Sequence, residues 1–378
     1  MNTHGLFILK NYKKRKKIEN DVLKIYRKVS PSHRNLIDSK SKTQFFNQRS
    51  NLFKTLGLPL SFFKNKKILE IGGGTGEKAL FYAFYGAQVT IVEPNEKSCI
   101  IAKKIFSQTK LAKKLTVINK SLFDIDISII KKFDMISAEG VLHHTFHPTE
   151  NLEFILKNMV SNQIILIAIG ESHGMLKREL QKMAVKQLAE DDPELIFHFV
   201  KELFPQHLLR ATKHDLRNVE SVIYDNYINP QDESSNLRDI CNAFFKNKIS
   251  YLSSYPKLDL FYITNPWNHE RKNQFNYKFY QSYYKFLEKI WMTSGEEKIF
   301  HDLSDFDIQK ISKRIDKDSK KLLQLKEKIK AKNFSKNDLK IIKKGYMGVG
   351  LHYFLGIKDN NDVKEFINCL KHYKKTEF

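Results

Sequence analysis

The fold is decided by residues 68–77, which read Ile-Leu-Glu-Ile-Gly-Gly-Gly-Thr-Gly-Glu. Apolar residues on both sides of Glu70, followed at once by glycines, indicate a buried parallel strand that ends in a tight turn. Glycine adopts a positive φ without a Cβ clash, and it lets a ligand lie against backbone N–H groups where a helix begins. Residues 77–83 are good helix formers and begin with an acid. The stretch therefore predicts a strand, a ligand-binding turn and a helix.

Two interpretations of this stretch are open when it is read alone. It matches any glycine-lined turn between a strand and a helix. Gly74-x-Gly76-x-x-Ala79 also matches the looser dinucleotide fingerprint G-x-G-x-x-A. Residues further along the chain are needed to choose between the two.

Strand and helix patterns alternate downstream, which predicts an α/β fold with a doubly wound, mostly parallel sheet and right-handed crossovers. The expected strands are residues 67–71, 89–92, 115–118, 133–137 and 163–169. Beyond them, residues 171–230 read as a helical insertion. Segments 249–254 and 349–358 have strand character, and we expect them to be the last two strands of the same sheet.

The strand pattern also predicts the domain organisation. The α/β domain is expected to be discontinuous, because a long helical stretch separates its last two strands. The expected boundaries are 1–60 for an N-terminal helical segment, 61–258 and 345–360 for the α/β domain, 259–344 for a second helical insertion and 361–378 for a C-terminal tail.

The formal net charge of +23 raises the question of an anionic partner. A nucleic acid or an anionic membrane surface would attract such a chain. Lysine is spread over nearly every polar face of the sequence, however, and no recognisable nucleic-acid-binding module accompanies it. We therefore favour a lysine- and asparagine-rich proteome as the origin of the charge, and keep a nucleic-acid partner as the alternative.

The remaining composition indicates a cytoplasmic protein. No apolar run approaches the roughly 20 residues needed to cross a bilayer, so no transmembrane segment is expected. The apolar residues 6–9 precede a basic cluster at 13–17, which is the reverse of a signal peptide. Cys99, Cys241 and Cys369 have no metal or disulfide spacing, and we interpret them as reduced thiols.

Three features after the glycine turn indicate a nucleoside ligand. Glu93 lies at the end of the second expected strand, where a carboxylate can accept hydrogen bonds from both hydroxyls of a ribose. Glu70 lies inside a buried strand and is costly there without a donor, which a cationic cofactor or its water would supply. Ser121 and Leu122 follow the third strand, where an adenine ring can be contacted. An ordinary loop acid and plain core residues are the alternative explanations.

Taken together, these residues resemble the class I, Rossmann-like S-adenosylmethionine-dependent methyltransferases. The resemblance covers residues 60–170, and its motifs are Glu70-x-Gly72-x-Gly74-x-Gly76, Glu93, 133–137 and the Gly-Val-Leu-His-His element at 140–144. This last element is what a dinucleotide site lacks. Segments 62–83, 139–145 and 223–230 further resemble an uncharacterised bacterial subgroup with a helical C-terminal extension.

The resemblance implies S-adenosylmethionine as the cofactor and a seven-stranded sheet that ends in an antiparallel pair. It also implies that the turn at 72–76 holds the amino-acid part of the cofactor, that Glu93 holds the ribose and that 121–123 contacts the adenine. The family commonly has an acid where this chain has Ser121.

Methyl transfer from a sulfonium requires an aligned acceptor and, where the acceptor carries a proton, a group that removes it. Residues after the fourth and fifth strands and in the insertion are expected to face the acceptor. Glu139 and His143 are the catalytic candidates. The substrate-binding candidates are His144, His173, Tyr224, Asp225 and Tyr227. No metal is expected, because Pro148 and the loop context make a ligand trio of His143, His144 and His147 unfavourable.

The sequence thus predicts a methyltransferase for a small or medium-sized metabolite, such as a saccharide or a lipid precursor. The alternatives are an RNA methyltransferase that uses the basic surface, a non-catalytic Rossmann-like scaffold and an NAD-dependent oxidoreductase. The oligomeric state is not indicated by the sequence.

Overall fold

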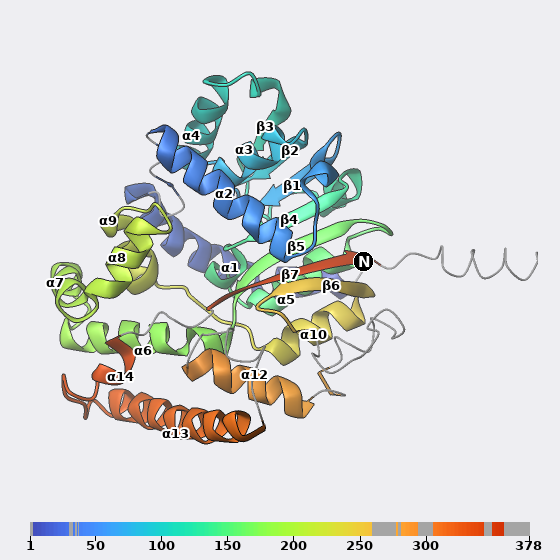
Figure 1. Ribbon diagram of the computed structural model, residues 1–378. Coiled ribbons are helices and arrows are strands. Elements are labelled where there is room, and N and C mark those ends of the chain that lie inside the picture. Colours follow the sequence, from blue (N-terminus) through green and yellow to red (C-terminus); the bar gives the residue numbers. More distant parts are fainter. Residues whose placement is uncertain are drawn as a thin grey trace, which may run out of the picture.

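The computed structural model describes residues 3–29, 33–34, 36, 38–258, 277–278, 281–293, 305–343 and 350–358. Its centre is a seven-stranded sheet in the order β3-β2-β1-β4-β5-β7-β6 (Figure 1). The strands are β1 Lys67–Ile71, β2 Gln88–Val92, β3 Leu115–Ile118, β4 Met135–Glu139, β5 Ile164–Gly170, β6 Ile249–Tyr255 and β7 Leu351–Lys358. β1 to β5 run parallel, whereas β7 is antiparallel to its neighbours β5 and β6. The predicted mostly parallel sheet with an antiparallel last strand is confirmed.

β4 begins at Met135, two residues later than the sequence pattern indicates. The residues before it are bonded to neighbouring segments. A carboxylate oxygen of Asp134 accepts a hydrogen bond from the N–H of Lys67 at 2.7 Å. The side-chain amide of Gln163 donates to the carbonyl of Phe133 at 2.6 Å. The pairing of β4 with β5 then extends to Glu139. Glu139 is therefore the last residue of a buried strand and not part of the following loop.

Helices cover both faces of the sheet. Helices α2, α3 and α4 pack on one face, and α5, α10 and α12 pack on the other. The helices of the N-terminal half are α1 Thr3–Lys28, α2 Ser39–Thr55, α3 Glu77–Phe84, α4 Glu96–Ser107 and α5 Pro148–Lys157, with 3₁₀ turns η1 Leu60–Phe63, η2 Ala112–Lys114, η3 Ile127–Lys132 and η4 Leu142–His144. The later helices are α6 Ser172–Leu188, α7 Pro193–Leu203, α8 Pro205–Lys213, α9 Val219–Ile223, the π-helical turn η5 Tyr224–Ile228, α10 Leu237–Lys246, α12 Gln281–Thr293, α13 Asp305–Lys330 and α14 Lys340–Lys343.

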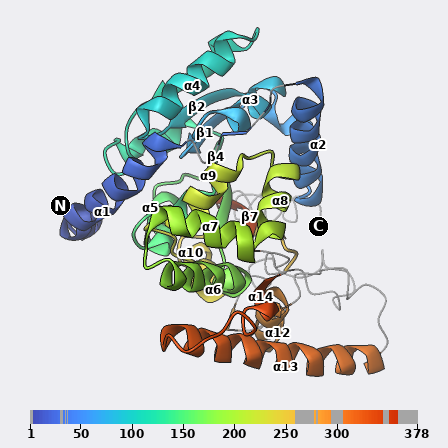
Figure 2. The same cartoon turned by 90° about the vertical axis from the view of Figure 1, so that its left-hand side faces the viewer.

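Helices α6 to α9 correspond to the predicted insertion, and they share an apolar core with α13 and α14. Figure 2 shows α8 and α9 in front of the sheet, between α1 and α2. α13 packs against α6 and α12, so the described helices of the second insertion lie against the first. The domain boundaries stay a prediction, and the expected tail 361–378 lies outside the described residues. Within the described part of the chain, none of the helices has the length and apolarity of a membrane span.

The predicted glycine turn follows β1 directly. Gly72, Gly74 and Gly76 all have positive φ angles, of 66°, 54° and 85°. A Cβ atom on Gly72 would lie 2.4 Å from a methyl carbon of Val141, which is closer than real Cβ atoms approach. Gly76 caps α3 in the left-handed conformation. Glycine is therefore required here by backbone conformation and by the close approach of the loop after β4.

An aromatic cluster fixes α2 on the sheet. The ring of Phe53 stacks on Phe81 of α3 with centroids 5.7 Å apart, and it meets Phe63 edge to face at 4.9 Å. All three side chains are fully buried. Such aromatic pairs add to the free energy gained by burying their apolar area. The N-terminal segment is thus packed as part of the α/β core.

We expect the Phe53→Ala variant to lower the free energy of unfolding by about 3–5 kcal/mol, because it opens a cavity inside this cluster. Phe84→Ala is the matched control, since the Phe84 side chain is 60% exposed, and it should change stability by less than about 0.5 kcal/mol. Urea-induced unfolding followed by circular dichroism measures both. Equal losses in the two variants would contradict the packing of α2 described here.

Candidate active site

A cavity of about 540 Å³ lies at the carboxyl ends of β1, β2 and β4. One wall is formed by the glycine turn, by Glu93 and by the loop 140–145. The other wall comes from α1, α6, α8 and η5. Open α/β sheets bind ligands at this edge, outside the carboxyl ends of their strands. The cavity therefore joins part of each predicted set in one space. It is lined by the cofactor-side residues Gly72, Gly74, Glu93 and Leu122 and by Glu139, His143, His144 and Asp225, whereas Gly76 does not line it.

Glu93 faces the glycine turn. Its Oε2 accepts a hydrogen bond from the N–H of Gly74 and its Oε1 accepts one from the N–H of Asn95, both at 2.9 Å. Burial raises the pKa of Glu93, and these two N–H groups limit the rise. Each carboxylate oxygen keeps a second lone pair, so the group can still accept hydrogen bonds from a diol. This geometry fits the predicted ribose contact.

Glu70 is fully buried beneath the turn and is not among the residues that line the cavity. Neither of its carboxylate oxygens accepts a hydrogen bond from a described residue, and the Nζ of Lys78 lies 3.4 Å from Oε1. Burial raises the pKa of Glu70 to about 7, although the Lys78 ammonium acts in the opposite direction. A buried carboxylate that accepts no hydrogen bond from a described residue, beside the glycine turn, fits a cationic ligand group.

The predicted adenine segment is divided between the turn and the cavity. Leu122 and Phe123 line the cavity. Ser121 does not line it, because its Oγ accepts a hydrogen bond from the N–H of Phe123 at 3.1 Å and so caps the turn. Ser121 therefore shapes the segment, and Leu122 and Phe123 supply the apolar surface that an adenine ring can contact.

Glu139 forms a bidentate ion pair with Arg49 of α2, with distances of 2.6 and 2.8 Å. The hydroxyls of Tyr82 and Ser137 also donate to its Oε1, at 2.6 and 3.0 Å. Burial alone would raise the pKa of Glu139, but the Arg49 guanidinium and the Lys78 ammonium outweigh burial and lower it to about 2. A carboxylate held in this way is a weak proton acceptor. The geometry favours a role in holding Arg49, and the predicted catalytic role has no support from it.

His143 and His144 form the 3₁₀ turn η4 and both line the cavity. Burial lowers the pKa of His143 to about 3, so its imidazole is neutral, and its Nδ1 has no hydrogen-bond partner among the described residues. The Nδ1 of His144 lies 3.1 Å from the carbonyl of Gln231, and its Nε2 lies 3.6 Å from Asp225. His144 therefore links the turn to the helical insertion, while His143 keeps a free ring nitrogen.

The other predicted acceptor-side residues do not all reach the cavity. Asp225 lines it and is bound by the Tyr26 hydroxyl at 2.8 Å and by Arg217 at 2.9 Å. Tyr227 is fully buried in the core of the insertion, where its hydroxyl lies 2.8 Å from the Nδ1 of His207.

His173 and Tyr224 also lie away from the cavity lining. His173 is held by the carboxylate of Glu171 at 2.9 Å at the start of α6. Tyr224 packs edge to face on Phe197 with centroids 5.5 Å apart. The sequence predicted these residues from their segment. Tyr227 instead faces the core of the insertion, and His173, whose side chain is 34% exposed, faces Glu288 of α12.

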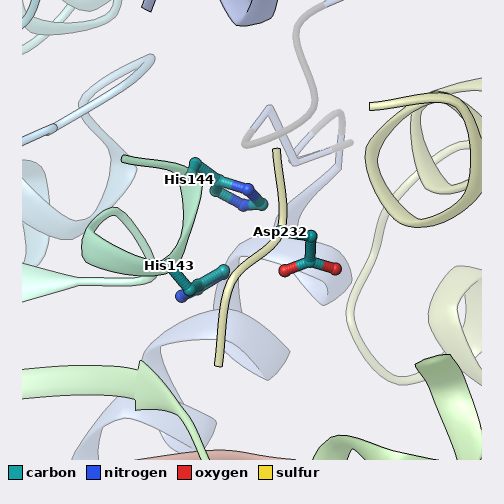
Figure 3. A group of neighbouring side chains, drawn as sticks. All are labelled: His143, His144 and Asp232. Atoms are coloured by element: carbon teal, nitrogen blue, oxygen red, sulfur yellow. The ribbon is translucent and has the colours of Figure 1, made fainter. Parts of the chain in front are cut away.

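His143, His144 and Asp232 form a group whose potential metal-ligand atoms lie within 4.8 Å of one another (Figure 3). The Oδ2 of Asp232 already accepts a hydrogen bond from the guanidinium of Arg178 at 2.8 Å. A divalent cation beside this guanidinium would meet electrostatic repulsion. Because Arg178 already neutralises Asp232, we assign no metal to the group.

Sequence reasoning missed several residues that line the cavity, among them Arg49 and Lys78. For Arg49 a signal was present, because it lies midway between Phe45 and Phe53 at helical spacing and therefore on the buried face of α2. A basic residue within an apolar stripe indicates a buried charge with a partner. Lys78 gave no such signal, since a lysine in the first turn of a helix is usually exposed.

Comparison with known proteins gives a domain match. Residues 45–211 match a family model described as a methyltransferase domain. No curated protein matches the sequence.

Several solved structures are similar to parts of the chain. PKMT2 from Rickettsia typhi is 17% identical, with 62% of this chain and 49% of that chain covered and a TM-score of 0.43. The same protein in complex with AdoHcy gives 18% identity, coverages of 62% and 50% and a TM-score of 0.42. A putative S-adenosylmethionine dependent methyltransferase from Listeria monocytogenes gives 20% identity, coverages of 33% and 57% and a TM-score of 0.28. The chain thus spans about half the length of these proteins, and similarity at this level says nothing about the acceptor.

The sheet order and the glycine turn define a Rossmann-like fold, with a cavity at the strand ends. With the match of residues 45–211 to a methyltransferase domain, this fold is consistent with a class I methyltransferase, and the cofactor of that class is S-adenosylmethionine.

Replacing Glu93 by glutamine should weaken the binding of S-adenosylhomocysteine about ten- to a hundredfold, because charge-assisted hydrogen bonds to the ribose are lost. Isothermal titration calorimetry measures the affinity. The exposed Glu96 is the matched control, and Glu96→Gln should bind like the unmodified protein. Unchanged affinity in Glu93→Gln would contradict the ribose assignment.

Glu70 should make the stability of the ligand-free protein depend on pH. Its pKa is raised from 4.5 to about 7 in the folded protein, so its burial is penalised increasingly as the pH rises from 4.5 to 7. We therefore compare the free energy of unfolding of Glu70→Gln with that of the unmodified protein at pH 5 and at pH 8. The difference should shift in favour of the variant on going from pH 5 to pH 8, by a few kcal/mol at most. Urea unfolding at both pH values tests this. A stability difference that does not change with pH would contradict the raised pKa.

Proposed function

We propose that the chain is an S-adenosylmethionine-dependent methyltransferase for a small or medium-sized polar metabolite, such as a saccharide or a lipid precursor. The observation that carries this proposal is a single cavity that joins the glycine turn and Glu93 to His143 and Asp225. Its volume of about 540 Å³ lies within the range of small-molecule sites, about 300–1,000 Å³.

The wall opposite the sheet favours a small acceptor over a polymer. Tyr26 of α1 donates a hydrogen bond to Asp225 at 2.8 Å and accepts one from Asn229 at 3.1 Å. The side chain of Gln48 on α2 donates to the carbonyl of His214 at 2.6 Å. The Tyr26 bonds join α1 to the insertion in the wall of the cavity, and the Gln48 bond ties α2 to the same insertion. A wall tied in this way favours a small acceptor over a chain of linked bases.

The acceptor side is lined by polar groups. Arg178, His207 and Arg217 come from the insertion and line the cavity together with Asp225 and Asn226. Guanidinium, imidazole, amide and carboxylate groups can bind hydroxyl or anionic groups in fixed directions. This lining supports a hydroxyl-rich acceptor such as a saccharide.

S-adenosylmethionine supplies, when bound, a methyl group on a sulfonium, which is already an excellent leaving group. The residues of this chain must then hold the acceptor in line and take its proton. His143 is placed for the second task, because its imidazole lines the cavity and its Nδ1 has no hydrogen-bond partner among the described residues. Burial lowers its pKa to about 3, so it is a weak proton acceptor in the ligand-free protein. Glu139 contributes by fixing Arg49 in the cavity wall.

The proposal is tested by offering the protein S-adenosylmethionine with a labelled methyl group together with the small-molecule, RNA and protein fractions of a cell extract. Label in the small-molecule fraction is expected. Label in the RNA fraction would contradict the proposed acceptor class and favour the RNA methyltransferase. Binding of S-adenosylhomocysteine without any labelled product would favour the non-catalytic scaffold.

In the labelled fraction, His143→Ala should lower turnover about a hundredfold or more, the range typical of a lost general base. Its affinity for S-adenosylhomocysteine should stay unchanged, because His143 lies on the acceptor side. His198→Ala is the control, since His198 is exposed on α7. Unaltered turnover in His143→Ala would contradict the assignment.

A further inference from the structure

Lys78 holds two acceptors at the inner end of the cavity. Its Nζ donates a hydrogen bond to the carbonyl oxygen of Glu139 at 2.8 Å and lies 3.4 Å from Oε1 of Glu70. The Lys78 side chain lines the cavity, whereas the carboxylate of Glu70 is fully buried behind it. In the described part of the chain, Lys78 supplies the only ion pair of Glu70. The ammonium group therefore lies between a buried acid and the ligand space.

The amino-acid part of a bound cofactor would place an ammonium group beside Glu70, as Lys78 does. The resemblance to methyltransferases places the amino-acid part of the cofactor at the turn 72–76, which begins two residues after Glu70. A lysine side chain and an α-amino group both carry three N–H donors and one positive charge. A buried carboxylate is costly without such a partner. Glu70 and the carbonyl of Glu139 can satisfy either ammonium group, but like charges repel, so the two cannot share these acceptors.

We propose that Lys78 is a place-holder for the cofactor: in the ligand-free protein its ammonium occupies the acceptors that the α-ammonium of S-adenosylmethionine takes on binding. This inference rests on the proposed function. The flexible four-carbon stem of lysine allows the side chain to leave without a change in the backbone. Glu70 thus keeps a positive partner in both states, and binding exchanges one ammonium for another.

The exchange explains how an acid can be kept beneath the turn. Without Lys78, the ligand-free protein would hold a bare carboxylate in a fully buried strand, and burial raises the pKa of this group to about 7 even with Lys78 present. In the ligand-free protein, the Lys78 ammonium balances the charge of the Glu70 carboxylate. Lys78 also competes with the ligand for Glu70. The α-ammonium of the ligand must displace it, so this ammonium adds less to the affinity than it would if Glu70 were free.

A cycle that combines two ligands with two proteins tests this role. The ligands are S-adenosylhomocysteine and its deaminated analogue, which lacks only the α-ammonium, and the proteins are the unmodified chain and Lys78→Met. In the unmodified protein, deamination should weaken binding less than about threefold, because Lys78 stays on Glu70. In Lys78→Met it should weaken binding about tenfold or more, because Glu70 is then left without a cation.

Isothermal titration calorimetry at pH 8, above the pKa of about 7 of Glu70, gives all four affinities, and Lys97→Met, at an exposed lysine of α4, is the matched control. An equal penalty for deamination in the unmodified protein and in Lys78→Met would overturn the inference. Failure of S-adenosylhomocysteine to bind the unmodified protein would instead overturn the proposed function. Because every comparison is made within one protein, a loss of stability in Lys78→Met does not change the outcome.

Discussion

Two carboxylates lie inside the sheet, on adjacent strands. Each needs a positively charged partner, and the helices that supply these partners are thereby brought to the site. Glu70 is in β1 and Glu139 is in β4, and each raises the cost of charging the other. Arg49 from α2 and Lys78 from α3 supply the positive charges. Removal of one partner of a buried pair typically costs about 3–5 kcal/mol. Helix α2 is therefore held on the sheet by charge as well as by aromatic packing, and the N-terminal segment becomes part of the site.

The acceptor side depends on a second set of contacts, between the loop after β4 and the end of the insertion. The N–H of Glu233 donates to the carbonyl of His143 at 2.8 Å, and the Gln231 amide donates to the carbonyl of Thr145 at 3.0 Å. The loop with the two histidines is thus fixed by residues that follow η5. The π-helical turn η5 carries Asp225 into the cavity wall. In the proposed site, the insertion therefore forms the acceptor side and the sheet forms the cofactor side.

The sequence predicted what is determined locally. The strand, the glycine turn and the position of Glu93 follow from hydrophobic pattern, glycine conformation and spacing along the chain. The orientation of the inserted helices is set by packing between distant segments, so the sequence could name Tyr227 as a candidate but could not show that it faces the core. Arg49 was missed for a different reason: its partner Glu139 lies 90 residues away, and only the folded sheet brings the pair together.

The excess of positive charge has little bearing on the chemistry of the cavity. Arg15, Arg49 and Arg178 are buried, and each is paired with an acid. Lysines such as Lys103 and Lys104 are exposed, where salt screens a charge beyond about 8 Å at physiological ionic strength. The electrostatic field on an acceptor inside the cavity therefore comes more from these buried ion pairs than from the net charge of the chain. A basic composition is therefore compatible with a neutral or a hydroxyl-rich substrate, and the buried pairs are the better guide to what the site binds.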